Sequence, residues 1–242
     1  MKGIILAGGT GSRLSPLTDV TNKHLLPVGK KPMIVHSVEK LVSENISDIM
    51  IVTGTEHMGD MISLLGSGKR FNCNLTYRVQ DEADGIAGAL SLCENFSQGG
   101  PIIVILGDNI FSDSLHASIK KFNNIKKSPK CSLSLIQVDD PGRFGVPLIK
   151  NEKIIKIIEK PEYPESNYCV TGIYLYDKNV FRFISQLRKS GRGEYEITDV
   201  NNSYIKEGHV GYTILNGWWT DAGTHESYHA ANSLCLDSQG GL

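Results

Sequence analysis

The chain has 242 residues, enough for one large domain or two small ones with a substantial core. Its 40% apolar and 21% charged residues are typical of a soluble globular protein, and a formal net charge of −1 excludes a global basic field for nucleic acid. No apolar run is long enough to cross a bilayer and no cleavable leader is recognisable, so we expect a cytoplasmic protein with no nucleic-acid or membrane partner.

The first half of the sequence alternates apolar strands with amphipathic helices. The segment at 101–109 shows almost no polar alternation, which is typical of a strand covered on both faces. Repeated strand–helix–strand units favour right-handed crossovers, so we predict a three-layer α/β/α, Rossmann-like fold with a mostly parallel central sheet. The predicted strands span 2–7, 48–54, 74–80, 101–109 and 131–138, and the predicted helices span 32–45, about 59–66, 85–96 and 113–123.

From about residue 145 the strands come closer together. We predict strands at 145–149, 153–160 and 169–176, followed by helices at 178–187 and 197–206. No linker rich in Pro, Gly or Ser and no internal repeat divides the chain, so we expect a single domain over 1–242 with a ligand-binding elaboration in its second half. The tail after Leu236 is expected to fray.

The five cysteines form no C-x-x-C pair and are odd in number, which argues against a zinc site and against a disulfide framework. Reduced cytosolic thiols are the default for such a pattern.

A glycine-rich turn, "ILAGGTGSRL" at 5–14, follows the first predicted strand. It is not a G-x-G-x-x-G fingerprint because Leu14 stands where the last glycine is required, and no Gly-Lys-Ser/Thr closes a Walker A loop. Two interpretations stay open here. The glycines could serve only a tight turn, or the backbone N–H groups of Gly8, Gly9, Thr10 and Gly11 could approach a phosphate that Arg13 clamps.

Several polar residues follow the predicted strands, at the edge where open α/β sheets bind ligands. Asp108 and Asp221 come from distant segments, and each could be a turn or helix-capping residue. As a pair beside a phosphate loop they would suit Mg²⁺, which favours a few carboxylates together with phosphate oxygens and water. Lys23 is either a surface lysine or, with Arg13, a partner for a triphosphate. The other residues at strand ends are Gln80, Asp81, Asn109, Glu159 and Lys160.

Taken in order, "KGIILAGGTGSRL", "NKHLLPVGKKPM", "GDN", "EKP", "VTGIYLYD" and "WWTDAGTH" resemble the sugar-1-phosphate nucleotidylyltransferases, over residues 2 to about 236. The similarity is greatest to a short form of the members that make dTDP-glucose for the dTDP-rhamnose pathway. It implies Mg²⁺-dependent transfer of dTMP from dTTP to glucose 1-phosphate, with release of pyrophosphate, in a homo-oligomer. The nucleotide-binding part would be about 1–140, and the sugar-phosphate-binding part about 141–236.

The resemblance also implies a role for each matching position. The loop from Gly8 to Gly11, with Arg13, would hold the nucleotide phosphates, and Lys23 would contact the α-phosphate and the attacking phosphate. Arg13, Lys23 and Asp108 would be the catalytic residues, and Asp108 and Asp221 would bind Mg²⁺. The remaining roles are base recognition by Gln80 and Gly85, and binding of the sugar phosphate by Asn109, Gly145, Glu159, Lys160, Val170 and Arg192.

Three positions depart from the family pattern. His24 replaces a usual Gln, Phe144 replaces a frequent Tyr, and Pro147 is expected to interrupt its strand. Two other functions are carried as alternatives. One is a nucleotidylyltransferase for another base or acceptor, using UTP or CTP with another phosphate. Thymine and uracil present the same edge to Gln80, so this residue cannot separate dTTP from UTP. A regulatory protein that binds nucleotide sugars without turnover is disfavoured because Arg13, Lys23 and both carboxylates are present.

Overall fold

The structure is a computed structural model that describes residues 1–237. It is mixed α/β, and its central, mostly parallel sheet is flanked by helices, as the alternation of strands and helices predicts. The chain forms two compact units whose segments interleave in sequence, and a single domain over 1–242 stays a prediction. The unit named here the β1 unit contains Lys2–Ala83, Ile105–Ser114 and the chain from Gly217 onward, and the β8 unit contains Asp84–Val104 and Leu115–Asn216.

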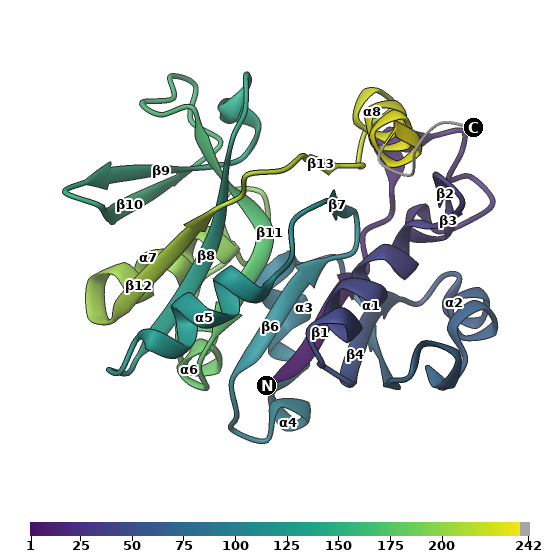
Figure 1. Cartoon of the computed structure of the whole chain (residues 1–242), viewed down its shortest axis with the longest axis horizontal. Coiled ribbons are helices and arrows are strands. Elements are labelled where there is room, and N and C mark those ends of the chain that lie inside the picture. Colours follow the sequence, from purple (N-terminus) through teal and green to yellow (C-terminus); the bar gives the residue numbers. More distant parts are fainter. Residues whose placement is uncertain (238–242) are drawn as a thin grey trace. The chain divides into compact units, whose positions relative to one another are not determined.

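Three parallel strands form the centre of the β1 unit. β1 (Lys2–Ala7) pairs with β4 (Asp48–Gly54), and β4 pairs with β5 (Asn74–Gln80). Figure 1 shows helix α1 (Met33–Ser43) lying along β1 and β4. The helix can approach closely because Gly3 of β1 has no side chain: a Cβ there would lie 2.7 Å from Leu41 Cδ1.

The predicted strand at 101–109 is wrong at its carboxyl end. β6 (Ile102–Leu106) stops before Gly107, and a separate strand, β7 (Asn109–Phe111), pairs antiparallel with β13 (Trp219–Asp221). A Cβ on Gly107 would lie 2.7 Å from His24 Cδ2, so the chain turns where only glycine leaves room for the imidazole. The apolar pattern hides this break because both strands are buried.

The end of the described chain packs on a small hairpin in the β1 unit. Helix α8 (His225–Asp237) meets β2 (Pro27–Val28) and β3 (Lys31–Pro32), with Asn232 Oδ1 accepting from the Gly29 N–H at 2.9 Å. The expected fraying after Leu236 falls mainly on residues 238–242, which lie outside the described residues. The remaining elements of the unit are the 3₁₀ turns Ser12–Leu14, Lys23–Leu25 and Lys69–Phe71 and helix α2 (Met58–Leu65).

The β8 unit is built around β8 (Lys130–Gln137), which pairs antiparallel with β11 (Tyr168–Tyr176) and parallel with β12 (His209–Ile214). This unit therefore contains antiparallel strand pairs in addition to the parallel pairs that the sequence predicts. The sequence analysis missed β12 because its six residues include Gly211 and only two aliphatic side chains. The predicted helix at 85–96 divides into α3 and α4. The helices are α3 (Ile86–Ser91), α4 (Glu94–Ser97), α5 (His116–Asn124), α6 (Asn179–Ser185) and α7 (Ile197–Glu207), with a 3₁₀ turn at Pro141–Arg143.

Pro147 does not interrupt its strand, contrary to the prediction. β9 (Gly145–Lys150) runs through it and pairs with β10 (Lys153–Glu159), with Pro147 opposite Ile157. The Ile157 N–H and C=O instead bond the side-chain amide of Asn202 on α7, at 2.9 Å each, so the proline faces a residue whose polar groups point away from it. β9 pairs with β11 only at Gly145, so the missing proline N–H removes no bond of that ladder.

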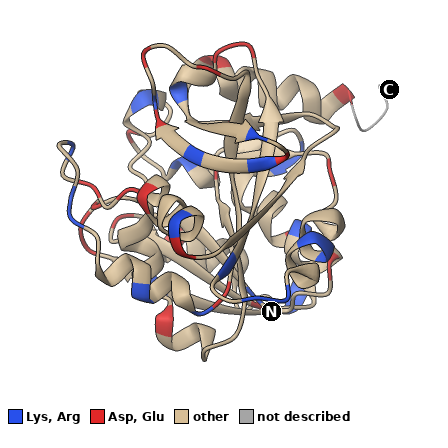
Figure 2. Ribbon diagram, turned by 90° about the vertical axis from the view of Figure 1, so that its left-hand side faces the viewer, with Lys and Arg blue, Asp and Glu red and all other residues tan. Residues whose placement is uncertain are grey.

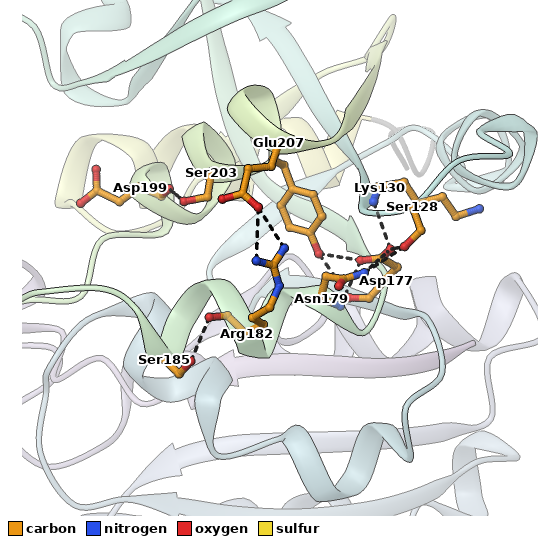
Figure 3. Close-up of polar contacts among 10 residues, drawn as sticks. Ser128, Lys130, Asp177, Asn179, Arg182, Ser185, Asp199, Ser203 and Glu207 are labelled. Atoms are coloured by element: carbon orange, nitrogen blue, oxygen red, sulfur yellow. Dashed lines mark hydrogen bonds and ion pairs between the residues drawn. The ribbon is translucent and has the colours of Figure 1, made fainter.

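Asp177 is the centre of a polar cluster in the β8 unit (Figure 3). It accepts hydrogen bonds from Ser128 Oγ (2.6 Å), the Lys130 N–H (3.0 Å), the Asn179 side chain (2.9 Å) and Tyr204 Oη (2.8 Å). Burial alone would raise the pKa of Asp177, but these donors hold the pKa below its ordinary value. The carboxylate thereby joins the starts of β8 and α6 to α7.

Figure 2 shows Lys and Arg residues interspersed with Asp and Glu residues along the ribbon. This distribution fits the near-zero net charge of the chain. Among the helices of residues 1–237, none combines the length and the apolar character that crossing a membrane requires.

We predict that Asp177→Asn lowers the free energy of unfolding by about 2–3 kcal/mol at pH 7, because an amide cannot accept from all of these donors. The folded-state pKa of Asp177 is depressed, so its contribution is present at pH 7 and is lost as the pH falls below about 4. Urea unfolding at pH 7 and pH 3 measures both effects. The control is Asp199→Asn, at an exposed position on α7, which should change stability by less than about 0.5 kcal/mol. Equal midpoints for the two variants at pH 7 would contradict the assignment.

Candidate active site

The glycine-rich turn leaves β1 as an open row of hydrogen-bond donors. Within residues 1–237, no acceptor meets the backbone N–H groups of residues 8–13. Gly9, Thr10, Ser12 and Arg13 are exposed, and Gly11 has a φ of 71°, a conformation that favours glycine. Successive free N–H groups after a strand are a binding site for anions.

Lys23 lies against this loop and extends to Asp108. Its 3₁₀ turn, Lys23–Leu25, is capped by Asn22, whose Oδ1 accepts from the His24 N–H at 2.9 Å. A Cβ on Gly11 would lie 3.0 Å from Lys23 Cβ, so this glycine makes room for the lysine, whereas a Cβ on Gly9 would lie at an ordinary contact distance of 3.5 Å from Lys23 Nζ. Lys23 Nζ is 2.5 Å from Asp108 Oδ2, and the two side chains are only 11% and 16% exposed.

The surroundings of Asp108 keep its carboxylate ionised. Burial by itself would raise the pKa of Asp108, but the charge of Lys23 and the hydrogen bonds from Lys23 and Asn109 hold this pKa well below its usual range. Asn109 Nδ2 donates to Asp108 Oδ1 at 3.0 Å, and Trp219 Nε1 in turn donates to Asn109 Oδ1 at 2.7 Å. An ionised carboxylate beside a lysine can serve as a ligand for a cation.

His24 is a buried neutral imidazole next to this pair. Burial, followed by the charge of Lys23, lowers the pKa of His24 to about 3. Its Nδ1 lies 2.7 Å from Asn22 Oδ1, an acceptor, which assigns the ring proton to Nδ1. The replacement of the family's usual Gln thus adds no positive charge to the site.

The β7–β13 pair brings the second predicted carboxylate segment to Asp108. Asp221 is in register with Asn109, and the Ala222 N–H donates to the Asp108 carbonyl at 2.9 Å. A Cβ on Gly223 would lie 3.2 Å from Arg13 Nη2 and 3.6 Å from Asp108 Oδ2. Arg13, Asp108 and the residues after Asp221 therefore meet in one place, although no group of three His, Cys, Asp or Glu side chains with metal-ligand spacing occurs within residues 1–237.

A pocket of about 180 Å³ lies next to the glycine loop in the β1 unit. Gln80, at the end of β5, approaches Gly8 so closely that a Cβ there would lie 2.7 Å from Gln80 Oε1. The sequence analysis missed Glu56 and His57, which also line the pocket, although they too follow the end of a parallel strand, β4. Gly8 thus accommodates the side chain of Gln80.

A second cluster, in the β8 unit, surrounds Glu159 at the end of β10. Thr198 Oγ1 donates to Glu159 Oε2 at 2.5 Å, and Gly145 lies opposite Glu159 in the β9–β10 pair. Lys160 has a φ of 44°, uncommon for a side-chain-bearing residue, and its Nζ is 3.9 Å from Glu159 Oε1. Val170 pairs with Gly145. The sequence analysis missed Thr198 because a threonine in the first turn of a helix is typical of ordinary helix starts.

Arg192 lies in this cluster, but Glu196 holds its guanidinium. Glu196 accepts from Arg192 Nε at 3.2 Å and from Nη2 at 2.8 Å, while Nη2 is 3.6 Å from Glu159 Oε1. Gly85 belongs to the same unit, where a Cβ would lie 2.7 Å from the Tyr195 carbonyl oxygen. The predicted site residues are thus divided between the two units.

Comparison with known proteins identifies the family. A family model described as nucleotidyl transferase matches residues 2–238. The chain belongs to this nucleotidyl transferase family. The resemblance drawn from the sequence motifs is thereby confirmed, and the chain is an enzyme.

Curated relatives in this nucleotidyl transferase family are glucose-1-phosphate thymidylyltransferases. That of Neisseria meningitidis serogroup A is 41% identical over 238 residues, which cover 97% of this chain and 82% of the relative. That of Mycobacterium tuberculosis is 38% identical over 231 residues, covering 94% and 79% of the two chains.

Solved structures of nucleotidyl transferases share the fold. One is described as a candidate glucose-1-phosphate thymidylyltransferase of Bacillus anthracis in complex with sucrose. It is 59% identical, with a TM-score of 0.93 over 98% of this chain and 96% of that chain. A UDP-glucose pyrophosphorylase with bound UDP-glucose has a TM-score of 0.83 over 98% of both chains, and at 23% identity it shows the fold alone.

We predict that Asp108→Asn lowers nucleotidyl-transfer turnover by about a thousandfold or more, because it removes the anionic partner of Lys23 and a carboxylate that the sequence predicts to bind Mg²⁺. Steady-state pyrophosphate release over a range of Mg²⁺ concentrations measures this. Asp48→Asn is a matched control. Asp48 begins β4, whose other end, at Gly54, lines the pocket beside the glycine loop, so this variant should keep the wild-type rate. Recovery of the wild-type rate by Asp108→Asn at saturating Mg²⁺ would show that the carboxylate is dispensable.

Proposed function

We propose that this chain transfers dTMP from dTTP to glucose 1-phosphate, giving dTDP-glucose and pyrophosphate. The observation that carries the proposal is the row of N–H groups at residues 8–13, which meet no acceptor among the described residues and lie beside the Lys23–Asp108 pair. Its other support is the set of curated relatives named glucose-1-phosphate thymidylyltransferase. The enzyme would be a cytoplasmic homo-oligomer. Its product, dTDP-glucose, would be used for the synthesis of dTDP-rhamnose.

The nucleotide would bind in the β1 unit. The N–H groups of Gly8, Gly9, Thr10 and Gly11 donate to the phosphates, and Arg13 neutralises the pyrophosphate as it departs. Lys23 holds the α-phosphate close to the phosphate oxygen that attacks it. Phosphoryl transfer of this kind depends mainly on positioning and on charge neutralisation, so no nucleophilic side chain is required.

The residues of the β1 unit fit a magnesium ion. Asp108 is ionised and its segment meets that of Asp221, a donor set of the kind Mg²⁺ takes when phosphates and water supply its other ligands. When bound there, Mg²⁺ would supply neutralisation of phosphate charge. Lys23 keeps the Asp108 carboxylate in place and anionic, and so available as a ligand for the ion.

In the β8 unit, the residues around Glu159 would hold the acceptor, and Asn109, in the β1 unit, stays a predicted sugar-phosphate contact. Glu159, fixed by Thr198, accepts from sugar hydroxyls, and the backbone of Gly145 and Val170 supplies further polar groups. Lys160 binds the sugar phosphate. Arg192 would bind the sugar phosphate only after its guanidinium leaves Glu196, which accepts hydrogen bonds from its Nε and Nη2.

Gly85, in the β8 unit, stays a second predicted contact for base recognition. In the β1 unit, base selection would rest on the side-chain amide of Gln80. The same amide can read thymine and uracil, because both bases present the same acceptor–donor–acceptor edge. Gly8 has to stay small for Gln80 to occupy its present position. UTP is therefore the competing nucleotide that an assay has to separate from dTTP.

The test is pyrophosphate release from each of dTTP, UTP, dCTP and CTP with glucose 1-phosphate, in Mg²⁺ and in EDTA. We expect the highest kcat/KM with dTTP and no turnover in EDTA. A higher kcat/KM with UTP would replace the proposed nucleotide, and absence of turnover with every nucleotide would leave a non-catalytic binding protein.

We predict that Arg13→Ala lowers kcat by about a hundredfold, with a smaller change in the KM for glucose 1-phosphate. The charge that Arg13 stabilises grows on the leaving pyrophosphate, so its contribution is larger in the transition state than in the bound substrates. Arg70→Ala, an exposed arginine stacked on Phe71, is the control and should keep the wild-type constants. If Arg13→Ala changed only the KM for glucose 1-phosphate, Arg13 would belong to the acceptor site instead.

A further inference from the structure

Thr18 lines the same pocket as the glycine loop, yet neither the sequence motifs nor the reaction gives it a role. It is half-buried and lies seven residues beyond Gly11. Its hydroxyl donates to the Gly11 carbonyl oxygen at 2.9 Å. Its methyl carbon, Cγ2, lies 3.0 Å from the point that a Cβ on Gly11 would occupy.

The Gly11 carbonyl is held by two donors. Besides Thr18, the Leu14 N–H donates to it at 2.8 Å, closing the 3₁₀ turn Ser12–Leu14. A carbonyl oxygen has two lone pairs, so both are occupied. Gly11 itself lies between the Thr18 methyl and Lys23 Cβ, each 3.0 Å from its missing Cβ.

Fixing this carbonyl also fixes the next backbone donor. The peptide between Gly11 and Ser12 is planar, so the Ser12 N–H points opposite to the Gly11 C=O. That N–H belongs to the row at residues 8–13 that meets no acceptor within residues 1–237. Gly11 has a φ of 71° and no side chain of its own to restrain it, so the orientation of this peptide depends on the two donors to its carbonyl, the Leu14 N–H inside the turn and the Thr18 hydroxyl outside it.

We propose that Thr18 is a positioning residue for phosphate binding: its hydroxyl holds the Gly11–Ser12 peptide so that the loop presents its N–H groups already oriented toward a triphosphate. This inference rests on the proposed function of the loop. Donors that are oriented before the ligand arrives need no reorganisation during the reaction, which is the source of their effect on binding and rate.

The test compares Thr18→Val, which keeps the shape of the side chain and removes the hydroxyl, with Thr18→Ser, which keeps the hydroxyl and removes the methyl. Isothermal titration with inorganic triphosphate in Mg²⁺ gives Kd, and steady-state kinetics with dTTP and glucose 1-phosphate give separate KM values. For Thr18→Val we expect Kd for triphosphate and KM for dTTP to rise about tenfold, the size of one lost hydrogen bond, while KM for glucose 1-phosphate changes less than about twofold. Thr18→Ser should restore both affinities to within about threefold of the wild type.

Other outcomes overturn the inference. If Thr18→Val binds triphosphate within about twofold of the wild type, or if both KM values rise equally, the hydroxyl has only a structural role. Should Thr18→Val unfold, Thr18→Ala removes the same hydroxyl without a β-branched side chain and carries the same expectation. If the wild type itself binds no triphosphate, the proposed function fails together with this inference, whereas wild-type binding with unaffected variants removes this inference alone.

Discussion

The β1 unit depends on one buried ion pair, between Lys23 Nζ and Asp108 Oδ2. Burying either charge alone would be costly, so each residue stabilises the other in its place. The pair also decides where small residues are needed. Gly11 makes room for the lysine, and Gly107 makes room for the imidazole of His24, which stays neutral beside two charges.

The same pair relates structure to reactivity. Because Lys23 keeps Asp108 anionic, the carboxylate can accept a cation without first losing a proton. Because the lysine lies under the glycine loop, its positive charge is close to the open N–H groups there. Positive charge and backbone donors next to an anionic carboxylate are what a phosphate and a metal ion together require.

The charged cluster around Glu159 in the β8 unit is more exposed to solvent than the Lys23–Asp108 pair. Glu159 and Arg192 are about 30% and 43% exposed, so water screens their ion pairs and these contribute little to stability. Thr198 fixes Glu159 through a short hydrogen bond, whereas Arg192 has Glu196 as an alternative partner. A carboxylate held in position and an arginine that can exchange partners suit recognition of a polar, anionic acceptor. Stability in this unit comes instead from buried groups such as the Asp177 cluster.

The sequence by itself determined the class of fold, most strands and helices, the family and a list of candidate residues. The fold class and the elements could be predicted because continuous apolar runs, helical periodicity and glycine-rich turns are local properties of the chain, whereas the family followed from the resemblance of six motifs taken in order. It failed at Gly107, where two buried strands read as one, at Pro147, where the strand continues, and at β12, whose short sequence has little apolar pattern. Only the tertiary structure decided that Lys23 pairs with Asp108, that Gly8 yields space to Gln80, that Glu196 holds Arg192 and that Thr18 holds Gly11. These contacts join residues whose distance in space is set by strand pairing and packing, which no local pattern of residues encodes.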